Sequence, residues 1–281
     1  MTPFKHSNHK LMEAKIGERS VSIIGQGTYG FGGYFNREAG HEKELAETLR
    51  HGISLGMRFI DTAEVYGSGM SEEIVGKAIS GLKREDVFIA TKVWRNHLEY
   101  DDVIASCKNS LERMKLKSVD LYQIHWPDES TPIKETMRAF EKLADDGLIR
   151  NIGVSNFSVR GLKEAIGALS RYELKSNQVH YNLDHRNIER EVLPFCKENR
   201  ISVIAYSPLG TGDLLHGRKA KVLSEIGAKY GGTKAQVALN WLVSKGVISI
   251  PKASRKEHVT ENAKSTDFML TKEDVASLEA A

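Results

Sequence analysis

The fold is clearest in the stretch from Arg58 to Lys92, which reads RFIDTAEVYGSGMSEEIVGKAISGLKREDVFIATK. An apolar run, Arg58–Ile60, opens this stretch, and a second apolar run, Val87–Val93, closes it. Between them Ser71 is a predicted helix N-cap, and apolar residues follow at helical spacing as far as Leu82. A strand, a crossover helix and a second strand are the repeating unit of a parallel sheet.

The same alternation continues along the chain. From Arg58 onward, strand starts recur at roughly thirty residues, the length of one strand-and-helix unit. Runs rich in Val and Ile with no polar alternation are typical of parallel strands that are buried on both faces. The expected strands are Val21–Ile24, Arg58–Ile60, Val87–Val93, Val119–Ile124, Ile149–Val154, Asn177–Tyr181, Ile201–Tyr206 and Val247–Ile250. Eight of them predict a closed (β/α)8 barrel, of the TIM-barrel kind, with an open doubly wound sheet as the alternative.

Smaller signals complete the predicted fold. Glu13–Ser22 has a glycine between two short runs and predicts a hairpin across the bottom of the barrel. Thr131-Pro132 predicts a cap followed by proline at the first helical position. Lys219–Lys229 and Thr233–Val243 are predicted helices in the longest interval between strands. Since no linker or composition break interrupts the chain, residues 1–281 are expected to form a single domain.

Composition excludes several classes of protein. The chain carries 40 Lys and Arg against 37 Asp and Glu, a formal net charge of +3, which argues against a strongly basic nucleic-acid binder. No stretch approaches the length of an apolar membrane span, and Met1–Lys10 lacks the apolar core of a signal peptide. Cys107 and Cys196 form neither a disulfide framework nor a metal-ligand pattern. Buried free thiols and a cytoplasmic location are therefore expected.

Two patterns resemble known motifs but fail on context. Gly25–Gly30 reads G-x-G-x-x-G, yet Phe31–Tyr34 follows where a dinucleotide-binding motif needs the start of a helix. The glycines are better explained by tight turns or by the close approach of a ligand. His41-Glu42 lacks the second histidine of a zinc-binding motif, and no metal site is expected.

Four ionisable residues stand at the ends of three predicted strands: Asp61 and Tyr66 after Arg58–Ile60, Lys92 at the end of Val87–Val93, and His125 after Val119–Ile124. In a barrel, residues at these strand ends meet on one face. A tyrosine has a pKa of about 10, and a neighbouring lysine lowers it. Asp61 would keep Lys92 charged, and His125 would orient a carbonyl oxygen. Such a set can protonate an oxygen while a hydride reaches the attached carbon, and a cofactor must supply that hydride.

Six stretches that include these residues resemble, in order, the signatures of the aldo-keto reductase superfamily. They are Gly56–Gly67, Thr91–Trp94, Ile124–Pro127, Gly153–Phe157, Tyr206–Gly210 and Ile250–Lys252. The resemblance covers about Gly25 to Asn262. It implies a (β/α)8 barrel and reversible NAD(P)(H)-dependent reduction of aldehydes or ketones. It also implies that Tyr66 is the general acid/base, tuned by Lys92 and Asp61, and that His125 orients the carbonyl.

The resemblance also implies a cofactor site. Its residues are Ser155, Asn156 and Gln178 at the nicotinamide carboxamide, Tyr206 stacked on the ring, Ser207, Leu209 and Gly210 along the pyrophosphate, and Lys252, Ser254, Arg255, Glu261 and Asn262 at the adenosine end. Two positions depart from the family pattern: Ala253 stands where many members have Ser, and His258 where many have Arg. Glu261 and Asn262 resemble the adenine-binding pair of the family, and Lys252, Ser254 and Arg255 can supply the cations and donors that a 2′-phosphate needs. NADP(H) is therefore the preferred cofactor, while the missing Arg leaves NAD(H) use open.

The substrate pocket is expected to involve Tyr29, Trp94, Trp126 and the segment Phe31–His41. Core packing is the alternative for both tryptophans. Because the sequence ends at Ala281, soon after a predicted helix, an open pocket with broad tolerance is expected. The leading function is carbonyl reduction of a small molecule. The alternatives are a non-catalytic, NADP(H)-binding regulatory subunit and a barrel enzyme of other chemistry, such as a phosphate-ester isomerase. The sequence leaves the oligomeric state open and is compatible with a monomer.

Overall fold

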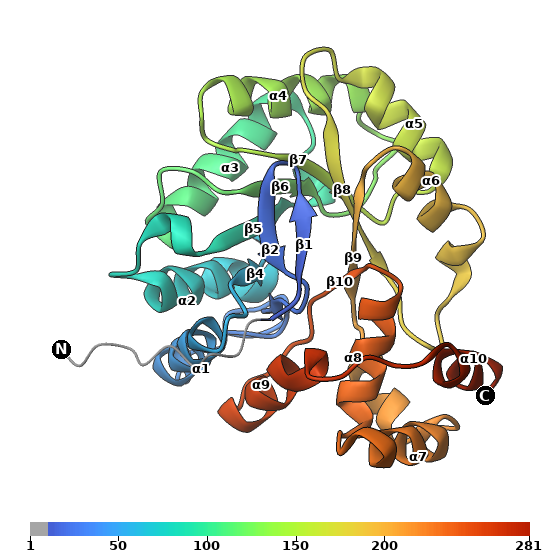
Figure 1. Cartoon of the computed structure of the whole chain (residues 1–281). Coiled ribbons are helices and arrows are strands. Elements are labelled where there is room, and N and C mark those ends of the chain that lie inside the picture. The colour runs from blue at the N-terminus through green and yellow to red at the C-terminus, as the bar shows by residue number, and fades with distance from the viewer. Residues whose placement is uncertain (1–10) are drawn as a thin grey trace.

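The structure of the protein is a computed structural model, and it describes residues 11–281. Eight parallel strands are arranged as a barrel (Figure 1). In hydrogen-bonded order they are β3 (Gln26–Gly27), β4 (Phe59–Asp61), β5 (Phe88–Val93), β6 (Leu121–Ile124), β7 (Ile152–Ser155), β8 (Leu174–His180), β9 (Ser202–Tyr206) and β10 (Ile248–Ser249). Parallel bridges from Ile24 to Ser249 and from Gly27 to Lys252 join the first and last strands. The predicted (β/α)8 barrel is therefore confirmed.

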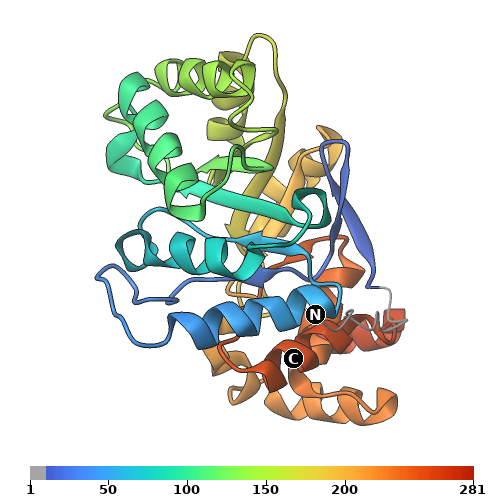
Figure 2. The same ribbon diagram turned by 90° about the vertical axis from the view of Figure 1, so that its left-hand side faces the viewer.

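The helices pack around the outside of these strands (Figures 1 and 2). They are α1 (Glu42–Ser54), α2 (Met70–Ile79), α3 (Tyr100–Met114), α4 (Ile133–Asp145), α5 (Val159–Ala168), α6 (Val192–Glu198), α7 (Ala220–Tyr230), α8 (Lys234–Ser244), α9 (Lys256–Ala263) and α10 (Lys272–Ala280). Their apolar faces and the strands share one large core. The strand–helix repeat places the carboxyl ends of the strands at one mouth of the barrel, which is where the active sites of such barrels lie.

The opposite end of the barrel is covered by the predicted hairpin. Strands β1 (Glu13–Ile16) and β2 (Arg19–Ser22) pair antiparallel, and Figure 1 shows them lying across the barrel strands. Ile16 and Val21 pack onto apolar side chains from inside the barrel. The expected barrel strand at Val21–Ile24 is only partly correct: Val21 and Ser22 belong to the hairpin strand β2, whereas Ile24 bridges to Ser249 of β10 just before β3 starts at Gln26.

Two predicted helix starts also need correction. Helix α2 begins at Met70 with Gly69 as its N-cap, so Ser71 lies inside the first turn. Its hydroxyl is buried and donates to the Thr28 hydroxyl at 2.7 Å, a tertiary contact that replaces a cap. Helix α4 begins at Ile133, one residue later than expected, and Pro132 takes the capping position without a side-chain hydrogen bond.

The glycine-rich stretch is part of the barrel wall. No helix opens in it, since α1 starts only at Glu42, and the rejection of a dinucleotide-binding motif is confirmed. A Cβ atom on Gly27 would lie 2.7 Å from the carbonyl oxygen of Ile250. Glycine is needed at position 27 because the backbone beside β10 comes this close.

Other expectations concern features outside the barrel. Cys107 and Cys196 are buried free thiols, as predicted. Among the helices of residues 11–281, none is both long enough and apolar enough to cross a bilayer. Over the same range, no three His, Cys, Asp or Glu side chains are grouped to hold a metal ion. The expectation for Met1–Lys10 lies outside the described residues.

Candidate active site

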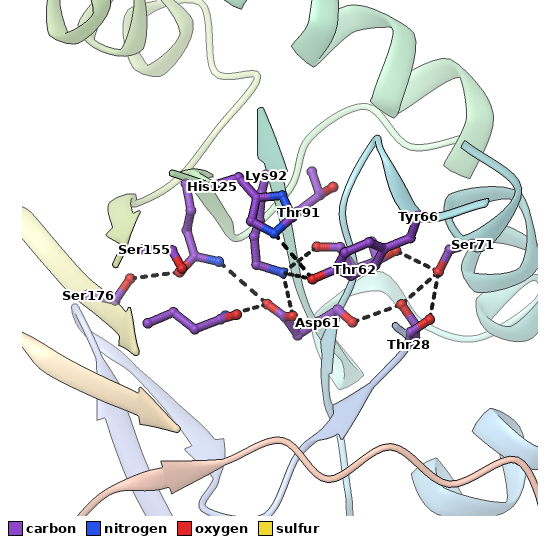
Figure 3. A network of polar contacts seen from close by, with 12 residues as sticks. Thr28, Asp61, Thr62, Tyr66, Ser71, Thr91, Lys92, His125, Ser155 and Ser176 are labelled. Atoms are coloured by element: carbon purple, nitrogen blue, oxygen red, sulfur yellow. Dashed lines mark hydrogen bonds and ion pairs between the residues drawn. The ribbon is translucent and has the colours of Figure 1, made fainter. Parts of the chain in front are cut away.

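The four ionisable residues singled out in the sequence meet at the mouth of the barrel (Figure 3). Asp61 ends β4, Lys92 lies in β5, and His125 follows β6 directly. Tyr66 begins the kinked turn Tyr66–Gly69 after β4, in which Gly67 and Ser68 have left-handed backbones. All four side chains are at most 8% exposed. The parallel register brings together residues that are up to 64 positions apart in the chain.

Lys92 is the centre of this group. Its ammonium donates to Asp61 Oδ1 at 2.6 Å, to the Thr62 carbonyl oxygen at 2.8 Å and to the Tyr66 hydroxyl at 3.4 Å. A fully buried ammonium is costly unless it is paired and hydrogen-bonded, and here all three donors have partners. Lys92 is thereby held as a charged group directly beside the Tyr66 phenol.

Burial sets the net acidity of Tyr66. It raises the pKa of the phenol above its usual value, and the Lys92 charge lowers that pKa only in part. The expectation of a lowered Tyr66 pKa is therefore wrong for the net direction, although the effect of Lys92 has the expected sign. Burial opposes the charge of Lys92, but Asp61 and Tyr66 outweigh it and hold the pKa of Lys92 above its usual value.

His125 is a neutral imidazole in this site. Burial, together with the nearby Lys92 charge, lowers the pKa of His125 to about 2. Its Nε2 atom lies 3.4 Å from the Tyr66 hydroxyl, and its Nδ1 atom is buried with no hydrogen-bond partner. Tyr66 and His125 thus present two neutral polar groups to the same point, which suits the recognition of a carbonyl oxygen.

The predicted carboxamide-binding residues lie beside this group. Gln178 Nε2 donates to Asp61 Oδ2 at 2.8 Å. The Asn156 amide donates to the His125 carbonyl oxygen at 3.1 Å and to the Ser155 hydroxyl at 3.0 Å. The structure therefore brings the ends of β4, β6, β7 and β8 into one polar network.

The predicted nicotinamide platform is joined to the same network. The Tyr206 hydroxyl donates to Asn156 Oδ1 at 2.9 Å. Three residues around it have left-handed backbones: Asn156 at φ 66°, Ser207 at φ 48° and Gly210 at φ 58°. Leu209 lies between the last two and is half-buried. Non-glycine residues in this conformation are strained, and such strain gathers at ligand-binding sites.

The predicted adenosine end is a separate, more exposed surface. Lys252, Ser254 and Arg255 are exposed ahead of α9. Arg255 Nη2 lies 2.5 Å from His258 Nε2, and His258 Nδ1 lies 3.2 Å from Glu261 Oε2. The histidine that departs from the family pattern thus connects a predicted 2′-phosphate residue to a predicted adenine residue. Asn262 is buried beneath this surface.

Aromatic side chains form the wall around Tyr66 and His125. Tyr29 and Phe35 come from the segment after β3, and Trp94 follows β5. The five rings make edge-on contacts in a closed circuit, with centroids 5.1 to 6.5 Å apart.

The two tryptophans belong to this region of the surface. Trp94 is half-buried and Trp126 is 39% exposed, so neither fills the barrel core. The core-packing alternative for both tryptophans is wrong.

Two supporting residues were not identified from the sequence. The Glu64 carboxylate accepts the Trp94 backbone N–H at 2.6 Å and lies 3.0 Å from His97 Nδ1. Gln123, fully buried in β6, places its Nε2 atom 3.5 Å from Asp61 Oδ2. Glu64 stands inside the Asp61–Gly67 motif, which could have indicated it. Gln123 is a polar residue in a mostly apolar predicted strand, and this exception to the pattern could have indicated it.

Comparison with known proteins agrees with this geometry. A model of the aldo/keto reductase family matches residues 23–281. The chain belongs to the aldo/keto reductase family. Methylglyoxal reductase YeaE of Escherichia coli K12 is 38% identical over 94% of this chain and 92% of its own length. Glyoxal reductase of Bacillus subtilis is 41% identical over 88% of this chain and 86% of its own.

Solved aldo/keto reductase structures share the fold. A thermostable aldo-keto reductase in complex with the inhibitor epalrestat has a TM-score of 0.92, with 41% identity over 96% of this chain and 99% of the other. An aldo/keto reductase from Klebsiella pneumoniae in complex with NADP and acetate has a TM-score of 0.87, with 36% identity over 96% and 95% of the two chains.

Proposed function

We propose that this aldo/keto reductase reduces carbonyl compounds with NADPH as the hydride source and Tyr66 as the proton donor. The observation that carries the proposal is the buried contact of Lys92 with both Asp61 and Tyr66, beside a neutral His125. This complete set supports catalysis over a regulatory role. Family membership sets aside the phosphate-ester isomerase alternative.

The proton is supplied from the Tyr66 phenol. Its raised pKa keeps it protonated at neutral pH, ready to donate to the carbonyl oxygen. Lys92 lies 3.4 Å away and stabilises the phenolate that this donation leaves, while Asp61 keeps the ammonium in place. The neutral His125 imidazole donates its hydrogen bond to the same oxygen and orients the carbonyl.

Bound NADPH supplies the hydride in this reaction. The donor set fits that cofactor. Ser155, Asn156 and Gln178 can pair with a carboxamide, and the Tyr206 ring can stack on the nicotinamide. The Ser207, Leu209 and Gly210 segment follows directly and would lie along the pyrophosphate.

The adenosine end fits a phosphorylated ribose. Lys252, Ser254 and Arg255 offer a cationic, hydrogen-bonding surface for a 2′-phosphate, and Glu261 and Asn262 lie close by for the adenine. We therefore propose NADP(H) as the preferred cofactor. The Klebsiella pneumoniae relatives in complex with NADP and NADPH support this choice.

The substrates we propose are small aldehydes, ketones and dicarbonyl compounds. Methylglyoxal reductase and glyoxal reductase are among the similar proteins. Tyr29, Trp94 and Trp126 would form the apolar walls of the pocket.

Two buried free cysteines also support a reducing, cytoplasmic location.

The test is turnover by the purified protein. NADPH oxidation is followed with glyoxal, methylglyoxal, an aromatic aldehyde and a simple ketone, and each assay is repeated with NADH. We expect turnover with NADPH on at least the dicarbonyls, at a higher kcat/KM than with NADH. Tight NADPH binding without turnover on any of these carbonyls would instead support the regulatory-subunit reading.

A further inference from the structure

A column of three rings stands at the edge of the predicted nicotinamide platform. The β8–β9 register pairs His180 with Tyr206, so the two side chains are cross-strand neighbours on one face. Their rings are 11° from parallel, with centroids 5.3 Å apart. The His185 ring stacks on the other side of His180, with centroids 4.0 Å apart. Gln178 is two residues before His180 and therefore shares its face of β8.

Asn182 connects this column to the backbone that follows Tyr206. Its Nδ2 atom donates to the Ser207 carbonyl oxygen at 2.9 Å and lies 3.3 Å from His180 Nε2. Its Oδ1 atom accepts the backbone N–H groups of Asp184 at 2.9 Å and His185 at 3.0 Å. The side chain is buried and has all its hydrogen bonds engaged, so its position is fixed.

Asn182 contacts Ser207 and His180 contacts Tyr206, and both contacted residues need a fixed conformation to bind the cofactor. Ser207 has a left-handed backbone, which persists only where the surroundings impose it. The Tyr206 ring is held at its hydroxyl by Asn156 and on one face by His180. In the proposed function, the nicotinamide would stack on the face of the Tyr206 ring that His180 does not contact.

We propose that His180 and Asn182 are positioning residues for the cofactor, which hold the Tyr206 ring and the Ser207 turn in the form that binds nicotinamide and pyrophosphate. The proposal rests on the proposed function, since it needs NADPH to bind at Tyr206 and Ser207. Holding these groups in place beforehand reduces the ordering that binding would otherwise require.

Variants at His180 separate ring stacking from other effects. An aromatic pair contributes enough to change a dissociation constant by about threefold to tenfold. His180→Ala removes the ring, and we expect the Kd for NADPH to rise by that factor. His180→Phe keeps a ring against Tyr206, and we expect its Kd to stay within about twofold of the unmodified protein. Asn182→Ala releases both Ser207 and His180, and we expect a rise of about tenfold.

A cofactor fragment distinguishes local from global effects. Adenosine 2′,5′-bisphosphate carries the adenosine end of NADPH without the nicotinamide. We expect His180→Ala to leave the Kd for this fragment within about twofold. Asn182→Ala should weaken the fragment less than it weakens NADPH, because the fragment keeps only the 5′-phosphate of the pyrophosphate and does not reach Tyr206. The value of kcat at saturating NADPH should also stay within about twofold, because the reacting groups are untouched.

Both ligands are titrated by protein fluorescence with the full chain. An unchanged NADPH Kd in His180→Ala, equal losses for both ligands, or no rescue by His180→Phe would overturn the positioning role. If Asn182→Ala does not fold, the two His180 variants still decide. Failure of the unmodified protein to bind NADPH at all would overturn the proposed function instead.

Discussion

At the scale of single residues, burial rather than charge sets the proton chemistry of the site. The pKa of Tyr66 lies above its usual value because the phenol is buried, even though Lys92 lies beside it. The pKa of His125 falls to about 2 for the same reason, with Lys92 adding to the effect. Of the two residues that we propose face the carbonyl, the tyrosine is therefore the proton donor at neutral pH, and the neutral histidine is not a protonated imidazolium.

This difference predicts the pH profile of reduction. Tyr66 stays protonated below its raised pKa, and the usual value of a tyrosine is about 10. His125 stays neutral above about pH 3, one unit above its pKa. We therefore expect kcat/KM for the carbonyl, at saturating NADPH, to be flat from about pH 5 to about pH 9. A rate that falls with an apparent pKa of about 6 to 7 would show that a protonated imidazole is required.

Lys92→Met tests whether the lysine stabilises the phenolate of Tyr66. The substitution keeps an unbranched side chain but removes the charge that stabilises the phenolate, so we expect kcat to fall by about 100-fold or more. Asp61→Asn in the same chain removes the unpaired carboxylate and controls for lost stability. Steady-state kinetics and NADPH titration measure both effects. An unchanged kcat in a folded Lys92→Met protein would contradict the account.

The sequence was informative where chemistry follows strand ends. Asp61, Lys92 and His125 could be placed together because each follows a recognisable apolar run. The net direction of the Tyr66 pKa could not be predicted, since burial depends on how other elements cover the site. Asn182 was missed for a related reason: its partners His180 and Ser207 come together only through the β8–β9 register.

At the scale of elements, the hairpin is tied to the barrel by one buried carboxylate. Asp120 lies directly before β6 and is fully buried. It contacts the guanidinium groups of Arg19 on β2, Arg84 at 2.6 Å and Arg150 at 3.3 Å, and it accepts the Ile89 N–H at 2.9 Å. The sequence indicated a hairpin at the bottom of the barrel but not this anchor, because the four contributing segments are far apart in the chain.

Asp120→Ala is therefore expected to be destabilising. It leaves the buried Ile89 N–H without its acceptor, which costs about 1–3 kcal/mol, and it removes the shared partner of three partly exposed guanidinium groups. Urea unfolding measures the free energy of unfolding. Arg150→Ala is the matched control: its side chain is 45% exposed, and a loss of at most about 1 kcal/mol is expected. Similar losses in the two variants would contradict this assignment.

At the scale of the whole molecule, the candidate site draws on both halves of the barrel. The proposed catalytic residues come from β4, β5 and β6 and the turns after them, while the proposed cofactor residues come from β7, β8, β9 and the segment around α9. A ligand that binds the folded chain across these elements, and not the unfolded chain, raises the free energy of unfolding.

Cofactor binding should accordingly raise the melting temperature. NADPH at about 100 times its Kd adds about 2.7 kcal/mol to the free energy of unfolding, which raises the melting temperature of a chain of this size by about 4–5 °C. NADH lacks the 2′-phosphate that Lys252, Ser254 and Arg255 are proposed to bind, so the same concentration should give a smaller shift. Differential scanning fluorimetry measures both. Equal shifts in melting temperature with NADPH and NADH would contradict the proposal that these residues bind the 2′-phosphate.

The most direct test of the central claim compares the unmodified protein with Tyr66→Phe, using methylglyoxal or the best substrate found. The phenylalanine keeps the ring and removes only the proton donor. The account predicts that kcat falls by about 100-fold or more while the NADPH Kd, measured by fluorescence, stays within about twofold. Near-normal turnover in Tyr66→Phe would contradict the assignment of Tyr66 as the proton donor.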